Sequence, residues 1–218
     1  QGDWSSDCAL PISNAAILAD FFKKKGSKTT VVGIPKTIDA DLQNKYIATS
    51  FGFDTACRVY SEIIGNICKD TLSSKKYTHF IKLMGRSASH ITLECALVTQ
   101  PNYTFIGEEV RESKKTLFDI VLEITDLVIE RSKLGKSYGV ILIPEGLLQF
   151  IPEIATLIEE IDLLLAEGKT SLETLSPASS RCFNYLPKNI QNQLLLERDA
   201  HGNFPLSSLE TDKLLSDL

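Results

Sequence analysis

The chain has 218 residues, of which 43% are hydrophobic and 23% charged, and its formal net charge at pH 7 is −5. This length suffices to bury one sizeable α/β core or two smaller lobes. The acidic balance without a run of basic residues excludes nucleic acid as an expected partner, and no apolar run approaches the roughly 20 residues of a membrane span, so we expect a soluble, cytoplasmic protein without membrane contact.

The five cysteines are odd in number and widely spaced, and none belongs to a C-x-x-C pair with partner histidines. The three histidines also lack metal-ligand spacing. We therefore expect reduced thiols that fill the core, and neither a disulfide framework nor a zinc site.

The first thirteen residues show no usable hydrophobic period. Their run Ala9-Leu10-Pro11-Ile12-Ser13 resembles the translation of a sequencing adapter. We interpret residues 1–13 as a leader that is either foreign to the gene or disordered, and we give its acidic residues no role.

From Asn14 to residue 143, amphipathic stretches alternate with short β-branched runs. Strands separated by amphipathic helices indicate right-handed βαβ units. This pattern predicts an α/β fold, a Rossmann-like parallel sheet with helices on both faces. The predicted helices are 14–25, 53–72, 89–98 and 117–132, and the predicted strands are 29–34, 79–84, 104–106 and 139–143.

After Gly146 the pattern changes to Leu-rich helical segments at 152–167 and 190–196, joined by polar, proline-bearing turns. We expect two regions: an α/β core over 14–150 and a mostly helical appendage over 151–218.

Two carboxylates follow the first predicted strand, in Pro35-Lys36-Thr37-Ile38-Asp39-Ala40-Asp41. In parallel sheets, ligands gather beyond the carboxyl ends of the strands. Two acids so close disfavour joint ionisation unless a cation lies beside them, and Mg²⁺ bridging phosphate oxygens would supply that charge. One carboxylate would then accept a hydroxyl proton, and Lys36 would neutralise a polyphosphate. Taken alone, the motif also fits a capped turn with solvated acids.

Two later strand ends also carry polar groups. The strand at 79–84 runs into Gly85, which permits close approach of a ligand, and Arg86, which suits bidentate phosphate recognition. The strand at 139–143 runs into Glu145, whose carboxylate can accept hydrogen bonds from sugar hydroxyls. Together with the acids and lysine above, these residues predict a site for a phosphorylated sugar.

Five ordered strings resemble the pyrophosphate–fructose 6-phosphate 1-phosphotransferase family, in the long form that includes the plant catalytic subunit. The resemblance runs from about Asn14 to Leu215, and the helical appendage echoes an insertion of that family. The family's Gly-rich phosphate loop, its GGDD segment and a later closing loop have no counterpart, so we expect an internal fragment with a partial core, an insertion truncated at its end, and no activity of its own. The strings are PKTIDAD (35–41), TSFGFDTA (49–56), KLMGRSASHITLECAL (82–97), IGEEV (106–110) and VILIPEG (140–146).

The resemblance implies reversible phosphoryl transfer from pyrophosphate to the 1-hydroxyl of fructose 6-phosphate, a glycolytic step that uses Mg²⁺. Asp39 resembles the proton acceptor, and Asp41 an acid that helps to hold the metal. Thr37 and Ile38 match a loop along the transferred phosphate and the sugar. Lys36 matches the lysine that stabilises the leaving group. The resemblance thus implies catalytic roles for Lys36, Thr37 and Asp39.

On the sugar side, Met84, Gly85 and Arg86 match the sugar-phosphate loop, and Glu145 matches an acid that binds fructose. Lys76-Tyr77 match a sugar-phosphate contact made across a subunit interface, so we expect a homodimer or higher homo-oligomer with shared sites. Lys76-Tyr77 as a solvated turn and Met84 as core packing stay open as alternatives. The substrate-binding residues implied are Thr37, Ile38, Asp39, Lys76, Tyr77, Met84, Gly85, Arg86 and Glu145.

Two other functions stay open. The first is an ATP-dependent 6-phosphofructokinase, since Lys36 alone does not exclude ATP and the GGDD segment that would decide is absent. The second is a non-catalytic regulatory subunit of a hetero-oligomer. Such subunits usually depart from the TIDAD and MGR patterns, and this chain keeps both.

Overall fold

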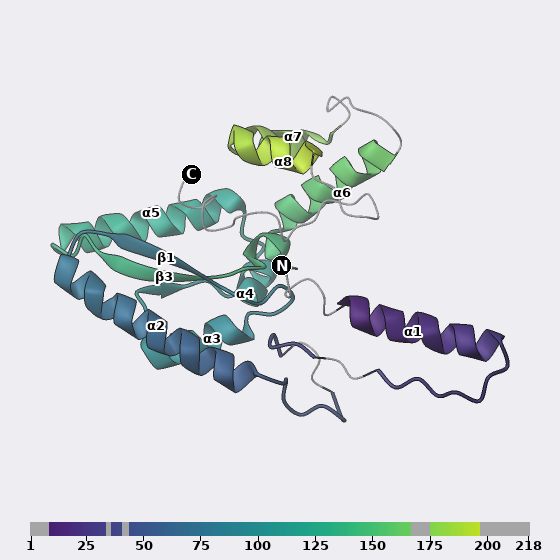
Figure 1. The fold of residues 1–218 in the computed structure, drawn as a ribbon. Coiled ribbons are helices and arrows are strands. Elements are labelled where there is room, and N and C mark those ends of the chain that lie inside the picture. The colour runs from purple at the N-terminus through teal and green to yellow at the C-terminus, as the bar shows by residue number, and fades with distance from the viewer. Residues whose placement is uncertain (1–8, 34–35, 41–43, 167–174, 197–218) are drawn as a thin grey trace.

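The computed structural model describes residues 9–33, 36–40, 44–166 and 175–196 (Figure 1). Its centre is a three-stranded parallel sheet in the order β1-β3-β2. The strands are β1 (Thr78–Leu83), β2 (Tyr103–Thr104) and β3 (Gly139–Pro144). The predicted α/β class with a parallel sheet is confirmed.

Strand β3 is the central strand, and all six of its residues are buried. Its side chains alternate between two clusters, as the two-residue period of a strand requires. Ile141 and Ile143 face one cluster, whereas Val140 and Leu142 face the other. A continuous apolar run such as this one is typical of a parallel strand covered on both faces.

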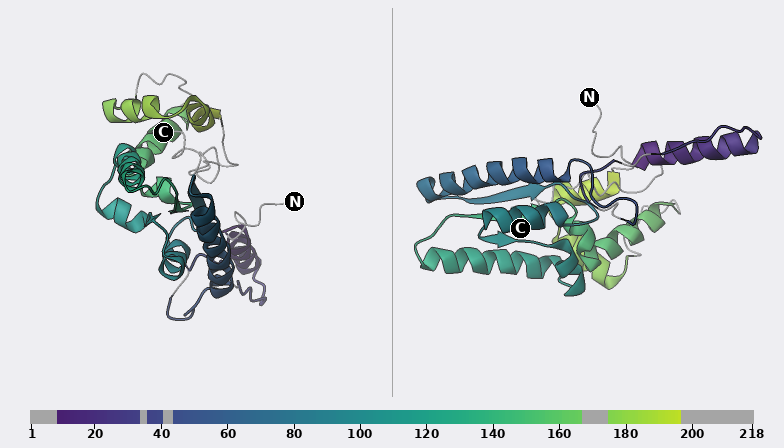
Figure 2. Two further views of the ribbon diagram at one scale, coloured as in Figure 1. Left: turned by 90° about the vertical axis from the view of Figure 1, so that its left-hand side faces the viewer. Right: turned by 90° about the horizontal axis from the view of Figure 1, so that it is seen from below.

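Helices cover both faces of the sheet. Helices α2 (Phe53–Ser74) and α3 (His90–Thr99) bury Cys57, Ile64, Ile91 and Cys95 against one face. Helix α5 (Leu117–Lys133) lies on the opposite face, as two further views show (Figures 1 and 2). These three helices and strands β1 and β3 differ from the predicted ranges by at most two residues at either end.

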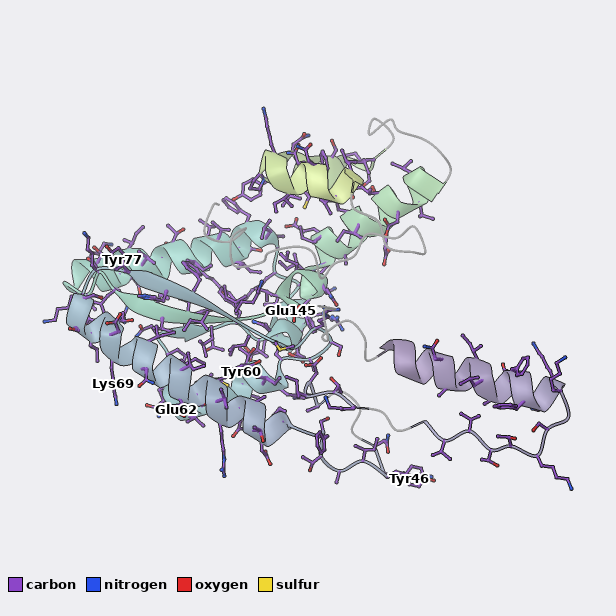
Figure 3. All side chains as sticks on the ribbon, viewed as in Figure 1. Tyr46, Tyr60, Glu62, Lys69, Tyr77 and Glu145 are labelled. Carbon is purple, nitrogen blue, oxygen red and sulfur yellow. The ribbon has the colours of Figure 1, made fainter. Side chains whose placement is uncertain are left out.

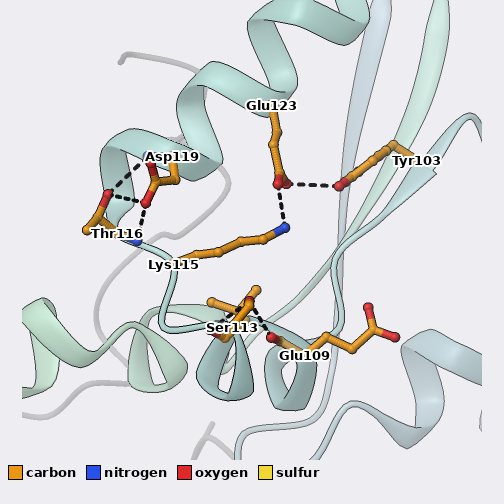
Figure 4. Close-up of polar contacts among 8 residues, drawn as sticks. Tyr103, Glu109, Ser113, Lys115, Thr116, Asp119 and Glu123 are labelled. Carbon is orange, nitrogen blue, oxygen red and sulfur yellow. Dashed lines mark hydrogen bonds and ion pairs between the residues drawn. The ribbon is translucent and has the colours of Figure 1, made fainter.

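A polar cluster anchors α5 (Figure 4). At its start, Thr116 and Asp119 form a capping box, in which each side chain accepts a hydrogen bond from the other's backbone N–H. One turn further along, Glu123 accepts a hydrogen bond of 2.9 Å from the hydroxyl of Tyr103 on β2. Its carboxylate also forms an ion pair with Lys115. The cluster thus ties α5 to the edge strand of the sheet.

The helical region after residue 151 shares its core with α5. Helix α6 (Pro152–Ala166) buries Leu157 and Ile161 in the same cluster as Ile120 of α5 and Phe183 of α7 (Pro177–Tyr185). The remaining helices are α4 (Gly107–Glu112), the 3₁₀ turn η1 (Leu147–Phe150), α7 (Pro177–Tyr185) and α8 (Lys188–Leu196). The described part of the appendage therefore packs on the α/β core.

One predicted strand is wrong. Residues 29–33, the described part of the predicted strand 29–34, form no strand, and Val32 is 78% exposed. A strand needs a neighbour to complete its ladder, and among the described residues the edge strands β1 and β2 pair only with β3. Helix α4 and helix α7 were not predicted, because α4 has only six residues and the nine residues of α7 lack the Leu-rich pattern of the predicted helices.

Helix α1 (Ala9–Lys24) stands apart from the sheet (Figures 1 and 2). It begins five residues before the predicted helix and so takes in the end of the segment interpreted as a leader; residues 1–8 lie outside the described residues. Its side chains Ile17, Leu18 and Phe21 are about half exposed or more.

The cysteines of the described region are free thiols, as predicted. Cys57, Cys95 and Cys182 are buried, and burial raises the pKa of Cys57 and of Cys182 to about 12. Thiols held in the protonated form are poor nucleophiles and metal ligands, so these side chains act as core packing.

Candidate functional site

The carboxyl ends of β1 and β3 lie at one edge of the sheet, because the two strands pair in register from Thr78 with Gly139 to Leu83 with Pro144. The pairing continues beyond the strands. The N–H of Glu145 donates to the carbonyl of Leu83 at 2.8 Å, and the N–H of Gly146 donates to the carbonyl of Gly85 at 3.0 Å. The loops that follow the two strands are therefore bonded to each other.

Two glycines make this close approach possible. A Cβ atom at Gly146 would lie 2.0 Å from the carbonyl oxygen of Arg86, well inside any real contact. Gly85 has φ of +127°, and a Cβ atom there would lie 2.7 Å from the carbonyl oxygen of Ala88. At Gly146 the close contact alone excludes a side chain, and at Gly85 the positive φ adds to the close contact.

Arg86 and Glu145 meet across the two loops. The Arg86 Nε lies 3.4 Å from the Glu145 Oε1, and the two side chains are 29% and 20% exposed. The pair is therefore partly exposed, and the backbone hydrogen bonds between the two loops hold its position. Guanidinium next to carboxylate offers both a phosphate partner and an acceptor for hydroxyl groups, which is the combination that the sequence predicted.

The loop at 36–40 lies beside this edge. Its turn is held by a hydrogen bond of 3.2 Å from the N–H of Asp39 to the hydroxyl of Thr37. Ile38 packs on the same apolar cluster as Met84, so the two predicted motifs share a support. Lys36 is exposed. Asp41, the predicted metal ligand, lies outside the described residues.

Tyr60 on α2 is a residue near the candidate site that the sequence did not indicate. Burial raises the pKa of its phenol, and the Cys95 thiol and the carboxylates of Asp39 and Glu145 raise it further. The two predicted acids thus act on one side chain, and Figure 3 labels Tyr60 and Glu145 at the same end of the sheet. Tyr60 occupies an apolar helix position one turn from Cys57, so its spacing is that of a core residue.

Lys76 and Tyr77 lie at the opposite end of the sheet from Glu145 (Figure 3). Tyr77 is 56% exposed, and the Lys76 ammonium lies 5.6 Å from the centre of its ring. The carbonyl of Tyr77 accepts a hydrogen bond from Gly139 and so aligns the starts of β1 and β3. Within one chain, the structure does not bring these residues to Arg86.

Ser89 and Glu108, which the sequence also did not indicate, support the loop after β1. The N–H of Ser89 donates to the Glu108 Oε1 at 2.9 Å, and the Ser89 hydroxyl accepts the N–H of Gly107 at 2.9 Å. Burial by itself raises the pKa of Glu108, but the hydrogen bonds from Ser89 outweigh it and hold that pKa below its usual range. The strings SAS and IGEEV were the only signal.

Within the described residues, no three His, Cys, Asp or Glu side chains form a metal-binding group. The Asp39 carboxylate and the Thr37 hydroxyl are nevertheless hard oxygen donors of the kind that Mg²⁺ prefers, and Mg²⁺ commonly binds through one or two carboxylates plus substrate phosphates. The donor set at this loop therefore fits Mg²⁺. Each helix in the described part of the chain is too short or too polar to cross a membrane.

Comparison with known proteins gives a consistent result. The family model described as Phosphofructokinase matches residues 13–176. Pyrophosphate–fructose 6-phosphate 1-phosphotransferase of Entamoeba histolytica is 53% identical over 218 residues, which cover 94% of this chain and 40% of that protein.

Two further relatives match similarly. The beta 2 subunit of the Arabidopsis thaliana enzyme of the same name is 53% identical over 93% of this chain and 37% of its own length. The Treponema pallidum enzyme of that name is 49% identical over 93% of this chain and 38% of its own length. The chain thus spans about 40% of the length of these curated relatives.

Proposed function

The chain belongs to the phosphofructokinase family, and on this basis we propose that the protein transfers a phosphoryl group reversibly between pyrophosphate and the 1-hydroxyl of fructose 6-phosphate, giving fructose 1,6-bisphosphate. The observation that carries the proposal is the Arg86–Glu145 pair beside the Asp39 loop, at one edge of a parallel sheet. We also propose that this glycolytic step takes place in the cytoplasm.

Asp39 is the proposed general base. It removes the proton of the 1-hydroxyl as that oxygen attacks phosphorus, and the hydrogen bond within its turn to Thr37 supports a fixed approach. Thr37 and Ile38 line the path of the transferred phosphate and the sugar. Lys36 neutralises charge that develops on the phosphate leaving group.

The sugar phosphate is held by the loops after β1 and β3. Arg86 binds the 6-phosphate, and Met84 and Gly85 supply backbone close to the sugar. Glu145 accepts hydrogen bonds from sugar hydroxyls. The shared backbone bonds of the two loops support this assignment, because substrate positioning within about 1 Å decides the rate of an in-line transfer.

Asp41 would help to hold Mg²⁺, which leaves the Asp39 carboxylate free to accept the proton of the 1-hydroxyl. When bound, the metal supplies positive charge to the phosphate oxygens and so favours the in-line displacement. The other contributions come from the chain's own residues, which position the acceptor hydroxyl and carry away its proton.

Lys76 and Tyr77 are proposed to complete the sugar-phosphate site of a second copy of the chain in a homodimer or higher homo-oligomer. Tyr77 lies at the far end of the sheet from Glu145, the partner of Arg86, which supports a contribution across an interface rather than within the chain (Figure 3).

The test is an assay of the complete protein with fructose 6-phosphate and Mg²⁺, comparing pyrophosphate with ATP. The names of the three relatives support pyrophosphate as donor. We expect kcat/KM with pyrophosphate to exceed that with ATP by at least about a hundredfold. Preference for ATP would favour an ATP-dependent phosphofructokinase, and sugar binding without turnover would favour a non-catalytic subunit.

A further inference from the structure

Helix α4 begins within the string IGEEV, which has no part in the function proposed above. It lies at the carboxyl end of the sheet (Figure 1). Two hydrogen bonds join its start to the loop that carries Arg86. The N–H of Ser89 donates to the Glu108 Oε1, and the N–H of Gly107 donates to the Ser89 hydroxyl, each at 2.9 Å. We call this pair of bonds the Ser89 clasp.

Ser89 departs from the usual behaviour of its position. It is the N-cap of α3, where a serine hydroxyl ordinarily accepts an N–H of the first turn of its own helix. Here the hydroxyl makes no such bond and accepts Gly107 from another segment instead. The residue is 2% exposed. Because buried Ser89 does not cap its own helix, we infer that its role is the contact with the segment at Gly107.

The same helix also touches the loop after β3. A Cβ atom at Gly107 would lie 2.4 Å from the ring of Phe150, so the ring packs directly on the backbone there. The Arg111 guanidinium lies 4.4 Å from the centre of the same ring. Phe150 belongs to η1, which starts two residues after Glu145. The start of α4 therefore contacts both loops of the sugar-phosphate site.

A displacement at Ser89 would be passed to Arg86, since the chain between them is tightly curled. Gly85 has a positive φ and lies against the carbonyl of Ala88. The same loop is bonded to Gly146 and ion-paired to Glu145. These restraints allow Ser89 little movement that is independent of Arg86.

We propose that Glu108 is a positioning residue for the sugar-phosphate site, which it serves by holding Ser89 and thereby the loop that presents Arg86. It acts through Ser89 and touches neither the sugar nor the transferred phosphate. The inference rests on the proposed function, because that function supplies the phosphate that Arg86 binds.

The first measurement is the affinity of the complete protein for fructose 6-phosphate, by titration calorimetry and as KM. Glu108→Ala is expected to weaken it about three- to tenfold, with the KM for pyrophosphate within about twofold of wild type. The affinity of Glu108→Gln for fructose 6-phosphate should lie between those of wild type and Glu108→Ala, since its amide oxygen still accepts the Ser89 N–H. The matched control is Glu109→Ala, an exposed carboxylate in the same turn, which should leave both values unchanged.

The second measurement is amide hydrogen exchange of a peptide covering residues 84–92, without ligand. Glu108→Ala should exchange about fivefold faster or more than wild type and Glu109→Ala should not, because a lost acceptor frees the Ser89 N–H. Unchanged exchange would overturn the inference, as would faster exchange with unchanged affinity for the sugar phosphate. If the wild type bound no fructose 6-phosphate, the proposed function would fail, and exchange alone would decide whether Glu108 holds the loop.

Discussion

Arg86 and Glu145 meet although 59 residues separate them in the chain. Each follows a parallel strand, and strands that pair in register deliver their next residues to one edge. Among the described residues Ile38 follows no strand, and it joins the site because it packs on the same apolar cluster as Met84. At the scale of single residues, the Arg86–Glu145 part of the candidate site follows from strand pairing.

Replacement of Arg86 by alanine should weaken binding of fructose 6-phosphate in the complete protein. A charge-assisted hydrogen bond to a phosphate contributes about 1.5–3 kcal/mol, so we expect the dissociation constant to rise by at least about tenfold. Direct titration checks this. Lys69→Ala, which removes a cation from the exposed face of α2, is the control and should have no effect. Unchanged affinity in Arg86→Ala would make Arg86 a structural residue.

Asp39→Asn should lower kcat by about two to four orders of magnitude and leave the affinity for fructose 6-phosphate close to that of wild type. The amide keeps the shape of the side chain but does not accept the proton of the 1-hydroxyl. Steady-state kinetics combined with titration separate the two effects. The control is Asp54→Asn, an exposed acid in the first turn of α2. Near-normal turnover would remove Asp39 from the reaction.

At the scale of helices and strands, the sequence predicted the ranges of those elements whose apolar residues pack on the sheet or within it. The ranges of α2, α3 and α5 were predictable because one face of each meets an apolar cluster, and the buried run at β3 was predictable for the same reason. The run at 29–33 carries the same β-branched residues, but its state depends on a pairing neighbour that local sequence does not encode.

The Ser89 clasp is a part of the candidate site that the sequence could not predict. Ser89 and Glu108 each look like ordinary helix-start residues, and their bond joins positions 19 residues apart. Tyr60 has the spacing of a core residue and is in fact packed on the core. Only the fold reveals that the carboxylates of Asp39 and Glu145 also act on it.

Glu160 on α6 links that helix to α7, which gives a pH-dependent prediction. Its Oε2 accepts the N–H of Ser176 at 3.0 Å, and this bond lowers the pKa of Glu160 from its ordinary 4.5. A carboxyl with a depressed pKa binds its proton less readily in the folded state. Its contribution to stability is therefore present above about pH 4.5 and is lost as the pH falls through the folded-state pKa.

We expect Glu160→Gln to lower the free energy of unfolding by less than about 1.5 kcal/mol at pH 7, with the difference from wild type shrinking below pH 4.5. Urea unfolding at several pH values measures it. Glu159→Gln, the exposed neighbouring acid, should show no such trend. A difference that stayed constant down to pH 3 would contradict the assigned pKa shift.

At the scale of the whole molecule, the two ends of the sheet carry different parts of the proposed site. Strand β1 has six residues, which span roughly 20 Å, and it separates Lys76-Tyr77 from Arg86. If the active unit is a dimer with shared sites, Lys76→Ala and Arg86→Ala damage the same site from opposite subunits.

Mixing the two variants should then restore activity. After subunit exchange, half of the dimers are mixed, and each mixed dimer has one site with both residues intact, so we expect about a quarter of wild-type activity at low fructose 6-phosphate. The measurement is activity of the mixture against each variant alone. If the mixture is no more active than the mean of the separate variants, Lys76 and Tyr77 form a solvated turn and do not contribute to a partner's site.

The approach of Gly146 to the backbone of Arg86 bears on how tolerance to mutation is interpreted in this region. A side chain at 146 would have to push the two loops apart by more than an ångström, and a shift of about 1 Å can cost roughly a hundredfold in rate. A comprehensive substitution scan would therefore mark Gly146 as sharply as Arg86. Intolerance alone would not identify which residues touch the substrate, since a glycine without a side chain would rank with the arginine that binds it.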